Sequence, residues 1–184
     1  MLRIATGKYK NKKLKVCQSV TRPFTERMRI SVLDLLKDYI QGASILDLYA
    51  GSGAVGIETL SRGAKKATFI ENDRKAYEIL RENIMKANVE ENTETYCISV
   101  HDFIRRSKYK FDIIFLDPPF SIQQNKNSIV DVSHLSEIMH ADSIIALRVE
   151  KEMYKKKRIN YEGLKEIYFK KFGRSIVVFY SIKI

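Results

Sequence analysis

Cysteines and long apolar runs are scarce in this chain, and each shortage excludes a class of protein. Cys17 and Cys97 lie far apart in 184 residues and have no metal-ligand spacing. Two isolated thiols argue against a disulfide-stapled scaffold and favour a reducing cytoplasm. No apolar run approaches the roughly 18 residues that a membrane span requires, and the first residues contain no apolar signal-peptide core. We therefore predict a cytoplasmic protein with no membrane partner.

Acidic residues are also few, above all at the start of the chain. The formal net charge is +11 and the pI is about 9.6. In positions 1–30, Glu26 is the single acid among many lysines and arginines. Such an excess favours a polyanionic partner, with nucleic acid ahead of an anionic membrane surface. The plain alternative is a basic background that serves solubility.

The order of apolar segments predicts an α/β protein. At 184 residues one compact domain is expected, and we find no internal repeat. Alternating strands and helices with short connections imply a three-layer domain with a mostly parallel sheet. The segments 164–172 and 174–182 flank Gly173 without a helix, which predicts a hairpin with one antiparallel strand. Strands are predicted at 44–50, 66–72, 93–100, 111–118 and 143–150, and helices at 54–64, 74–88, 102–109 and around 128–140.

The first 41 residues are predicted to form a small basic extension to a main domain at 42–184. LRIATGKYKNKKLKV indicates two short strands around a polar turn at residues 10–12. A helix is expected from Thr25, a possible N-cap, to Ile40, with Gly42 just beyond its end. The residues expected on its apolar face are Met28, Val32, Leu35, Leu36 and Tyr39.

A glycine pattern follows the first predicted strand of the main domain. Gly51, Gly53 and Gly56 satisfy G-x-G-x-x-G between a strand and a helix, although many such turns use glycine for other reasons. Asp47 precedes this turn, and Glu71 ends the next strand, where an acid can accept from ribose hydroxyls. Together they favour a nucleoside-containing cofactor.

The acids around this turn favour S-adenosylmethionine over a dinucleotide. A dinucleotide brings a pyrophosphate, whereas adenosylmethionine carries a sulfonium and an ammonium, which suit an acid at Asp47 better. Asp102 follows the third strand of the main domain, where its carboxylate could accept from an adenine amine. The alternative for Asp102 is a helix N-cap.

The run FDIIFLDPPF ends a strand with an unusual combination of residues. In an open α/β sheet, ligands bind beyond the carboxyl ends of the strands. An amine conjugated to a base is a poor nucleophile, and the Asp117 carboxylate with the Pro118 carbonyl could hold its two hydrogens. Pro119 stiffens the loop without adding an N–H, and Phe120 offers a face for stacking on the base. A rigid turn with Phe120 in the core is the alternative.

These residues resemble the RsmD-type bacterial methyltransferases over nearly the whole chain. The shared segments are DLYAGSGAVGIETLSRGA, FIEND, FLDPPF, KKFGRSIVVFY, RIATGKYKNKKLKV and TRPFTERMRISVLDLL. The resemblance implies a Rossmann-like class I methyltransferase sheet. It also implies methyl transfer from S-adenosylmethionine to the 2-amino group of a guanine in 16S ribosomal RNA, leaving S-adenosylhomocysteine. The implied partner is 16S rRNA, the small subunit or an assembly intermediate, and we expect the protein to be a monomer.

The predicted site residues fall into three groups. In two places the chain departs from the family pattern: Asn11 stands where glycine is usual, although Asn tolerates positive φ, and Phe24 replaces a common threonine. Both departures concern RNA contacts more than chemistry. The predicted cofactor-binding residues are Asp47, Tyr49, Ala50, Gly51, Ser52, Gly53, Glu71, Asn72, Asp102 and Phe103. The predicted catalytic residues are Asp117, Pro118, Pro119 and Phe120. The predicted RNA-binding residues are Lys8, Lys10, Lys12, Lys13, Arg22, Thr25, Arg27 and Arg29.

Three other functions fit parts of the pattern. DPPF also fits a DNA adenine or cytosine amino-methyltransferase, but we see no obvious separate target-recognition domain. The glycine turn alone fits a nicotinamide-dependent oxidoreductase. A degenerate, non-catalytic RNA-binding protein is a third alternative, against which the intact DPPF and glycine turn argue. We find no sequence motif that demands a metal.

Overall fold

The computed structural model describes residues 2–17, 24–119, 132–156 and 163–183. Within this part of the chain no helix combines the length and the apolarity needed to cross a membrane. In chain order the elements are β1 (Leu2–Arg3), β2 (Lys13–Leu14), α1 (Glu26–Leu35), α2 (Lys37–Ile40), β3 (Ser44–Leu48), α3 (Ala54–Ser61), β4 (Lys66–Ile70), α4 (Arg74–Ala87), the 3₁₀ helix η1 (Glu90–Asn92), β5 (Thr93–Tyr96), α5 (Val100–Arg106), β6 (Phe111–Leu116), the 3₁₀ helix η2 (Val132–Ile138), β7 (Met139–Glu150), α7 (Lys151–Lys156), β8 (Leu164–Phe172) and β9 (Ser175–Ile182).

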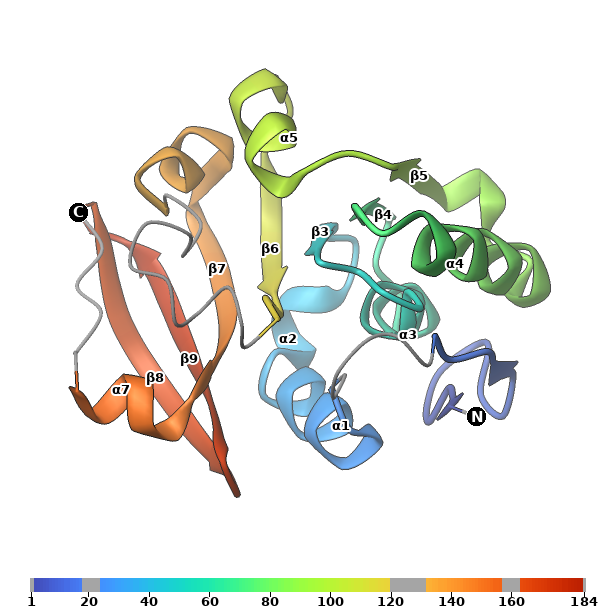
Figure 1. Cartoon of the computed structure of the whole chain (residues 1–184), viewed down its shortest axis with the longest axis horizontal. Coiled ribbons are helices and arrows are strands. Elements are labelled where there is room, and N and C mark those ends of the chain that lie inside the picture. The colour runs from blue at the N-terminus through green and yellow to red at the C-terminus, as the bar shows by residue number, and fades with distance from the viewer. Residues whose placement is uncertain (1, 18–23, 120–131, 157–162, 184) are drawn as a thin grey trace.

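A seven-stranded sheet of order β5-β4-β3-β6-β7-β9-β8 forms the centre of the molecule (Figure 1). The pairs β3–β4, β4–β5, β3–β6 and β6–β7 are parallel, and only β9 runs against its neighbours β7 and β8. Gly173, at a φ of 57°, lies in the turn between β8 and β9. The predicted α/β fold, with an antiparallel strand in a C-terminal hairpin, is confirmed.

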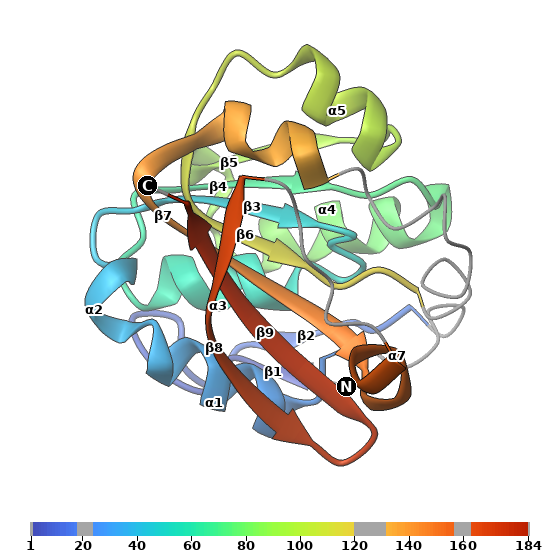
Figure 2. The same ribbon diagram turned by 90° about the vertical axis from the view of Figure 1, so that its left-hand side faces the viewer.

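Each strand divides its side chains between two cores, because successive residues of a strand point to opposite faces. On one face Ile45, Ile113 and Phe115 pack with residues of α1, α2, α3 and α4. On the other face Leu46 and Ile114 pack with residues of α5, η2 and α7. The helices therefore cover the sheet on both sides, as Figures 1 and 2 show.

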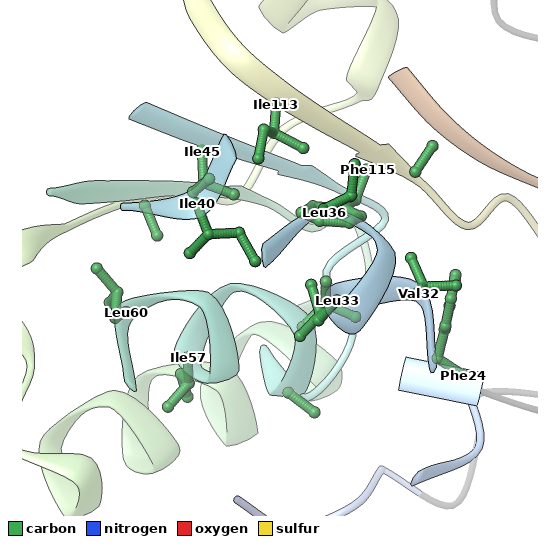
Figure 3. Packing of buried hydrophobic residues seen from close by; sticks show 14 of the residues in the cluster. Phe24, Val32, Leu33, Leu36, Ile40, Ile45, Ile57, Leu60, Ile113 and Phe115 are labelled. Atoms are coloured by element: carbon green, nitrogen blue, oxygen red, sulfur yellow. The ribbon is translucent and has the colours of Figure 1, made fainter. Parts of the chain in front are cut away.

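The predicted helix from Thr25 to Ile40 is broken into α1 and α2 at Leu36, whose φ and ψ are −96° and 8°. The break moves the buried face. Leu33 and Ile40 are buried in place of the predicted Leu35 and Tyr39, which are 41% and 55% exposed. Figure 3 shows Leu33, Leu36 and Ile40 packed between α3 and the sheet.

The N-terminal hairpin packs onto the main domain. Ile4 and Leu14 are fully buried in the same hydrophobic cluster as the sheet residues. The turn between β1 and β2 contains Asn11 at a φ of 70°, the left-handed conformation that glycine would otherwise provide. The hairpin and α1 pack into the same hydrophobic core as the sheet. The boundary predicted at residue 41 therefore divides the sequence but not the core. Its role as an RNA-facing unit stays a prediction.

The order in which strands are added to the sheet reverses between β3 and β6. From β3 the chain adds β4 and β5 on one side, and it then returns to place β6 and β7 on the other. Such a switch point leaves a crevice beyond the carboxyl ends of the two central strands. The residues that follow β3, β4 and β6 therefore meet at one edge, which we call the carboxyl edge.

Candidate active site

The turn between β3 and α3 has an unusual backbone. Tyr49, Gly51 and Gly53 have φ values of 64°, 54° and 76°. A Cβ added to Gly51 would meet no described atom within 4 Å, so the backbone conformation, rather than packing, demands glycine there. At Gly53 a Cβ would lie 2.3 Å from Leu80 Cδ1, so this glycine also permits close contact with α4. The turn is therefore rigidly held on its α4 side and open at Gly51.

Two acids, Glu71 and Asp47, accept hydrogen bonds from main-chain N–H groups in and just after the glycine turn. The main-chain N–H of Gly51 donates to Glu71 Oε2 at 2.7 Å, and that of Gly56 donates to Asp47 Oδ2 at 3.0 Å. Burial, and then the nearby Asp117 and Glu71 carboxylates, raise the pKa of Asp47 well above its usual range, and the Gly56 hydrogen bond offsets part of this. Burial, and secondarily Glu71, raises the pKa of Tyr49 to about 12. The site therefore gathers several carboxyl groups in a desolvated place, which opposes the ionisation of Asp47.

The other predicted cofactor residues are placed around this turn. Ala50 is half-buried, Ser52 is buried and Asn72 is exposed after β4. Asp102 lies in the first turn of α5, where its carboxylate accepts from the Ser99 hydroxyl at 2.6 Å. That hydrogen bond holds the pKa of Asp102 below its usual value. The N-cap is Ser99 itself, whose Oγ accepts from the Asp102 N–H at 3.0 Å. Phe103 is buried, and its ring packs against Tyr96 with the ring centres 5.4 Å apart.

Asp117 follows β6 and forms an ion pair that the sequence analysis did not anticipate. Its Oδ1 accepts from Arg148 Nε of β7, and the side chains of Asp117 and Arg148 are 15% and 5% exposed. The Phe24 main-chain N–H donates to the same carboxylate. Phe24 also places its ring 5.7 Å from the Arg148 guanidinium carbon. Burial raises the pKa of Asp117 to about 6, although Arg148 and Phe24 act in the opposite direction.

The rest of the DPPF segment is described only in part. Pro118 is buried and Pro119 is half-buried, and neither is in a cis peptide bond. Phe120 lies outside the described residues, so its predicted stacking role stays a prediction. Asp117 lies near the glycine turn, because its N–H faces the Leu48 carbonyl at 3.5 Å and β3 and β6 are paired up to Leu48 and Leu116.

A second residue that the sequence analysis missed is Asn83 of α4, which is fully buried. Its Nδ2 donates to the Ser52 carbonyl at 2.8 Å and the Lys15 carbonyl at 3.0 Å, and its Oδ1 accepts from the Lys15 N–H at 2.8 Å. Asn83 thus ties the glycine turn to the segment after β2. The signal in the sequence was a polar residue on the apolar face of a strongly amphipathic helix.

The lysines predicted to bind RNA lie at the far ends of α3 and α4. The main-chain N–H of Lys8 donates to the Ser61 carbonyl at the end of α3, and Lys12 Nζ donates to the Ala87 carbonyl at the end of α4, at 2.8 and 2.6 Å. Since α3 begins at the glycine turn, its eight residues place the hairpin turn about 12 Å away from that edge. Lys8, Lys10 and Lys13 are exposed, whereas Lys12 is half-buried.

The second predicted RNA-binding group has mixed positions. Arg27 is exposed on α1, and Thr25 caps α1 by accepting from the Met28 N–H at 3.2 Å. Arg29 is only 1% exposed, its Nη2 donates to the Arg3 carbonyl at 2.6 Å, and its Nε lies 3.6 Å from Glu58 Oε2. A guanidinium so enclosed cannot face RNA in this structure, so we correct its assignment to a structural one. Arg22 lies outside the described residues.

Comparison with known proteins places the chain in a family. The family model described as "Conserved hypothetical protein 95" matches residues 2–181. Ribosomal RNA small subunit methyltransferase D of Haemophilus influenzae is 36% identical over 132 residues, covering 70% of this chain and 68% of that protein. The Escherichia coli K12 protein of the same name is 38% identical over 122 residues, covering 65% and 60%. The solved structure of the Escherichia coli protein yhhF aligns with a TM-score of 0.85 at 26% identity. The alignment covers 100% of this chain and 98% of that one. The chain therefore belongs to the conserved hypothetical protein 95 family, and the RsmD-type methyltransferase that its sequence predicts is confirmed.

Proposed function

We propose that this protein transfers a methyl group from S-adenosylmethionine to the exocyclic 2-amino group of a guanine in 16S ribosomal RNA. The observation that supports this most is the placement of Asp117 beside the glycine turn, at the edge where β3 and β6 end. One residue suited to holding an amine thus neighbours a turn suited to holding a nucleoside. The relatives named above act, by their names, on small-subunit ribosomal RNA.

The glycine turn fits S-adenosylmethionine. Gly51 borders open space, and the carboxyl groups of Glu71 and the buried Asp47 lie beside the turn. A ligand with a sulfonium and an ammonium would favour the ionised form of Asp47, whereas a pyrophosphate would oppose it. We assign Gly51, Gly53 and Asp47 to the methionine end, Glu71 to the ribose and Asp102 to the adenine. When bound, the cofactor supplies an electrophilic methyl group.

Asp117 is assigned to the guanine amine. Arg148 binds Oδ1, and we assign the remaining acceptor capacity of the carboxylate, together with the Pro118 carbonyl, to the two amine hydrogens. Held in this way, the nitrogen can direct its lone pair toward the methyl group, and positioning supplies much of the rate. A carboxyl group with a pKa of about 6 is a weak base. It therefore takes up a proton after the nitrogen has become cationic, not before.

The experiment that tests this function uses Asp117→Asn. Asp117→Ala would leave the buried Arg148 without its partner and could unfold the protein. Asn keeps an oxygen for Arg148 Nε, but then presents an NH₂ group to the guanine amine, donor against donor. We expect methyl transfer to unmodified small-subunit RNA to fall about 100-fold or more, with calorimetric affinity for S-adenosylmethionine unchanged.

Mass mapping of the RNA provides the second half of the test. Small-subunit RNA from a strain lacking the gene should lose one methylated guanine, which the wild-type gene restores and the Asp117→Asn gene does not. An added DNA arm separates the alternative amino-methyltransferase. Methylation of DNA but not RNA, or full activity of Asp117→Asn, would refute the proposal.

A further inference from the structure

The outer strand of the sheet, β8, exposes a group of apolar and aromatic side chains. Ile167, Tyr168 and Phe169 are 48%, 50% and 39% exposed. Within the described residues β8 pairs with β9 alone, so its outer edge carries no strand there. Figure 2 shows this strand at the front of the molecule, beside β9. Such a group of exposed apolar side chains makes this strand a candidate surface for a partner.

Lysines lie beside these rings. Lys171 Nζ is 5.6 Å from the centre of the Phe169 ring, and Lys170 Nζ is 6.0 Å from that of Phe172. The two pairs point to opposite faces of β8, because neighbouring residues of a strand alternate. Glu166 is the only acid of the strand, and it already accepts from the Tyr154 hydroxyl at 2.8 Å. An aromatic ring can stack on a base, and an ammonium group beside it can contact the neighbouring phosphate. This combination is suited to an unpaired nucleic acid strand, whose bases are free to stack.

The register of the sheet places this surface level with the candidate active site. Leu116 pairs with Leu147, Leu147 with Val178, and Val178 with Phe169, so Leu116 and Phe169 end one row across four strands. Asp117 directly follows Leu116. Three strand spacings separate the ends of this row, a distance of about 14 Å. An RNA strand spans that distance with roughly four stacked nucleotides.

The lysines of the β1–β2 hairpin are too far from the carboxyl edge to contact the nucleotides that are bound there. Lys8 and Lys12 are anchored at the ends of α3 and α4, on the opposite side from the glycine turn. RNA that enters the carboxyl edge would therefore meet cations other than these, such as the exposed Arg27 of α1. Lys170 and Lys171 are further candidates, since Lys170 pairs with Val177 and Val177 with Arg148, the partner of Asp117.

We propose that the β8 surface, defined as residues 168–171, binds the unpaired RNA strand that flanks the target base. Phe169 and Lys171 lie on one face of β8 and Tyr168 and Lys170 on the other, so the RNA strand runs along the outer edge of β8, where a base can stack on either ring and a phosphate can meet either lysine. The proposal rests on the proposed function for the identity of the RNA, but binding can be measured without methyl transfer. The surface is then a determinant of which RNA reaches Asp117.

The test measures binding of fluorescently labelled, unmodified 16S rRNA to two variants. Phe169→Leu keeps an apolar side chain against Tyr154 but removes the flat ring, and Lys170→Gln with Lys171→Gln removes two charges. We expect each to weaken RNA binding roughly tenfold and to raise the KM for RNA, with kcat and S-adenosylmethionine affinity unchanged. The matched controls are Tyr109→Leu and Lys108→Gln with Lys110→Gln, an exposed aromatic and two exposed lysines that precede β6 at the opposite edge. These should change binding less than twofold.

Three outcomes would overturn the proposal. The first is wild-type affinity in both β8 variants, and the second is an equal loss in the control variants, which would indicate general charge attraction. The third is a wild-type dimer, seen by sedimentation, that Phe169→Leu converts to a monomer, because β8 would then join two copies of the chain. If wild-type protein binds 16S rRNA through β8 yet methylates no RNA, only the proposed function fails.

Discussion

At the scale of single residues, the Asp117 carboxylate has partners that the sequence pattern did not reveal. DPPF indicates an amine-binding acid at the end of a strand, and it contains no sign of Arg148, which lies 31 residues further along the chain. The two meet because β6 and β7 are paired in parallel with Leu116 opposite Leu147. Phe24, read from the sequence only as a departure from the family pattern, contributes its N–H to the same carboxylate. A motif can predict which residue performs the chemistry. The partners of that residue come from a neighbouring strand, and they can be identified only once the pairing of the strands is known.

The raised pKa of Asp117 predicts a pH dependence. The carboxyl group is half protonated at about pH 6, and the protonated form loses both the Arg148 ion pair and its charge as an acceptor. Single-turnover methyl transfer should therefore fall as the pH drops below 6, by roughly tenfold per unit. Arg148→Gln should move the inflection to higher pH, because Arg148 lowers this pKa. Rates measured from pH 5 to 8, with circular dichroism to verify folding, check both expectations. A rate that is flat across this range would contradict them.

The same shift has the opposite consequence for stability. Because the folded protein binds the Asp117 proton more tightly than the unfolded chain does, this group stabilises the fold most below about pH 4. That contribution is lost as the pH rises through about 6. Activity and the contribution of Asp117 to stability should therefore change in opposite directions between pH 4 and 6.

At the scale of elements, Glu58 of α3 joins three segments that are distant in the sequence. Its buried carboxylate accepts from the N–H groups of Ala5 and Thr6 at 2.9 and 3.0 Å, and it lies 3.6 Å from Arg29 Nε of α1. Burial is the main cause that lowers the pKa of Arg29, and Glu58 opposes it. The family resemblance, together with the basic charge of the first thirty residues, predicted RNA binding for Arg29. Neither can tell a buried, paired arginine from an exposed one. The β8–β9 hairpin followed directly from Gly173, but the helix predicted around 128–140 was wrong at its end: the 3₁₀ helix η2 ends at Ile138, and β7 begins at Met139, before the predicted residue 143.

Removing the Glu58 charge should therefore loosen the hairpin and α1 together. We expect Glu58→Gln to lower the free energy of unfolding by about 3–5 kcal/mol, because the buried Arg29 loses its counter-charge. Urea unfolding measures this. The control is Glu78→Gln, which breaks the exposed pair with Arg74 on α4 and should cost less than about 0.5 kcal/mol. Adding Arg29→Met to Glu58→Gln should destabilise by less than the sum of the two single changes. Equal stability of Glu58→Gln and Glu78→Gln would contradict the role of Glu58.

At the scale of the whole molecule, the lysines that we assign to RNA lie in two separate places. The net charge of +11 predicted a polyanionic partner, but a total cannot say where that partner binds. The β1–β2 turn lies about 12 Å beyond the glycine turn along α3, and the β8 surface lies about 14 Å from Leu116 across the sheet. One RNA molecule would have to contact both, with the target base between them.

This division predicts that RNA size decides which lysines matter. A short stem-loop carrying the target guanine should reach the β8 surface but not the hairpin turn, whereas complete 16S rRNA should reach both. Lys170→Gln with Lys171→Gln should therefore weaken binding of both RNAs, and Lys8→Gln with Lys10→Gln should weaken only that of the complete RNA. Lys12 is left unchanged, because its bond to the Ala87 carbonyl also stabilises the end of α4.

Salt titrations of the same complexes separate charge from stacking. Each lysine that contacts a phosphate contributes about one unit to the slope of log affinity against log salt concentration. Each double lysine variant should thus reduce the slope by about two with the RNA that it contacts. Phe169→Leu should lower the affinity at every salt concentration and leave the slope unchanged, because a base stacked on a ring releases no counterions. If Phe169→Leu changes the slope as the lysine variants do, the ring only supports Lys171, and RNA is held at β8 by charge alone.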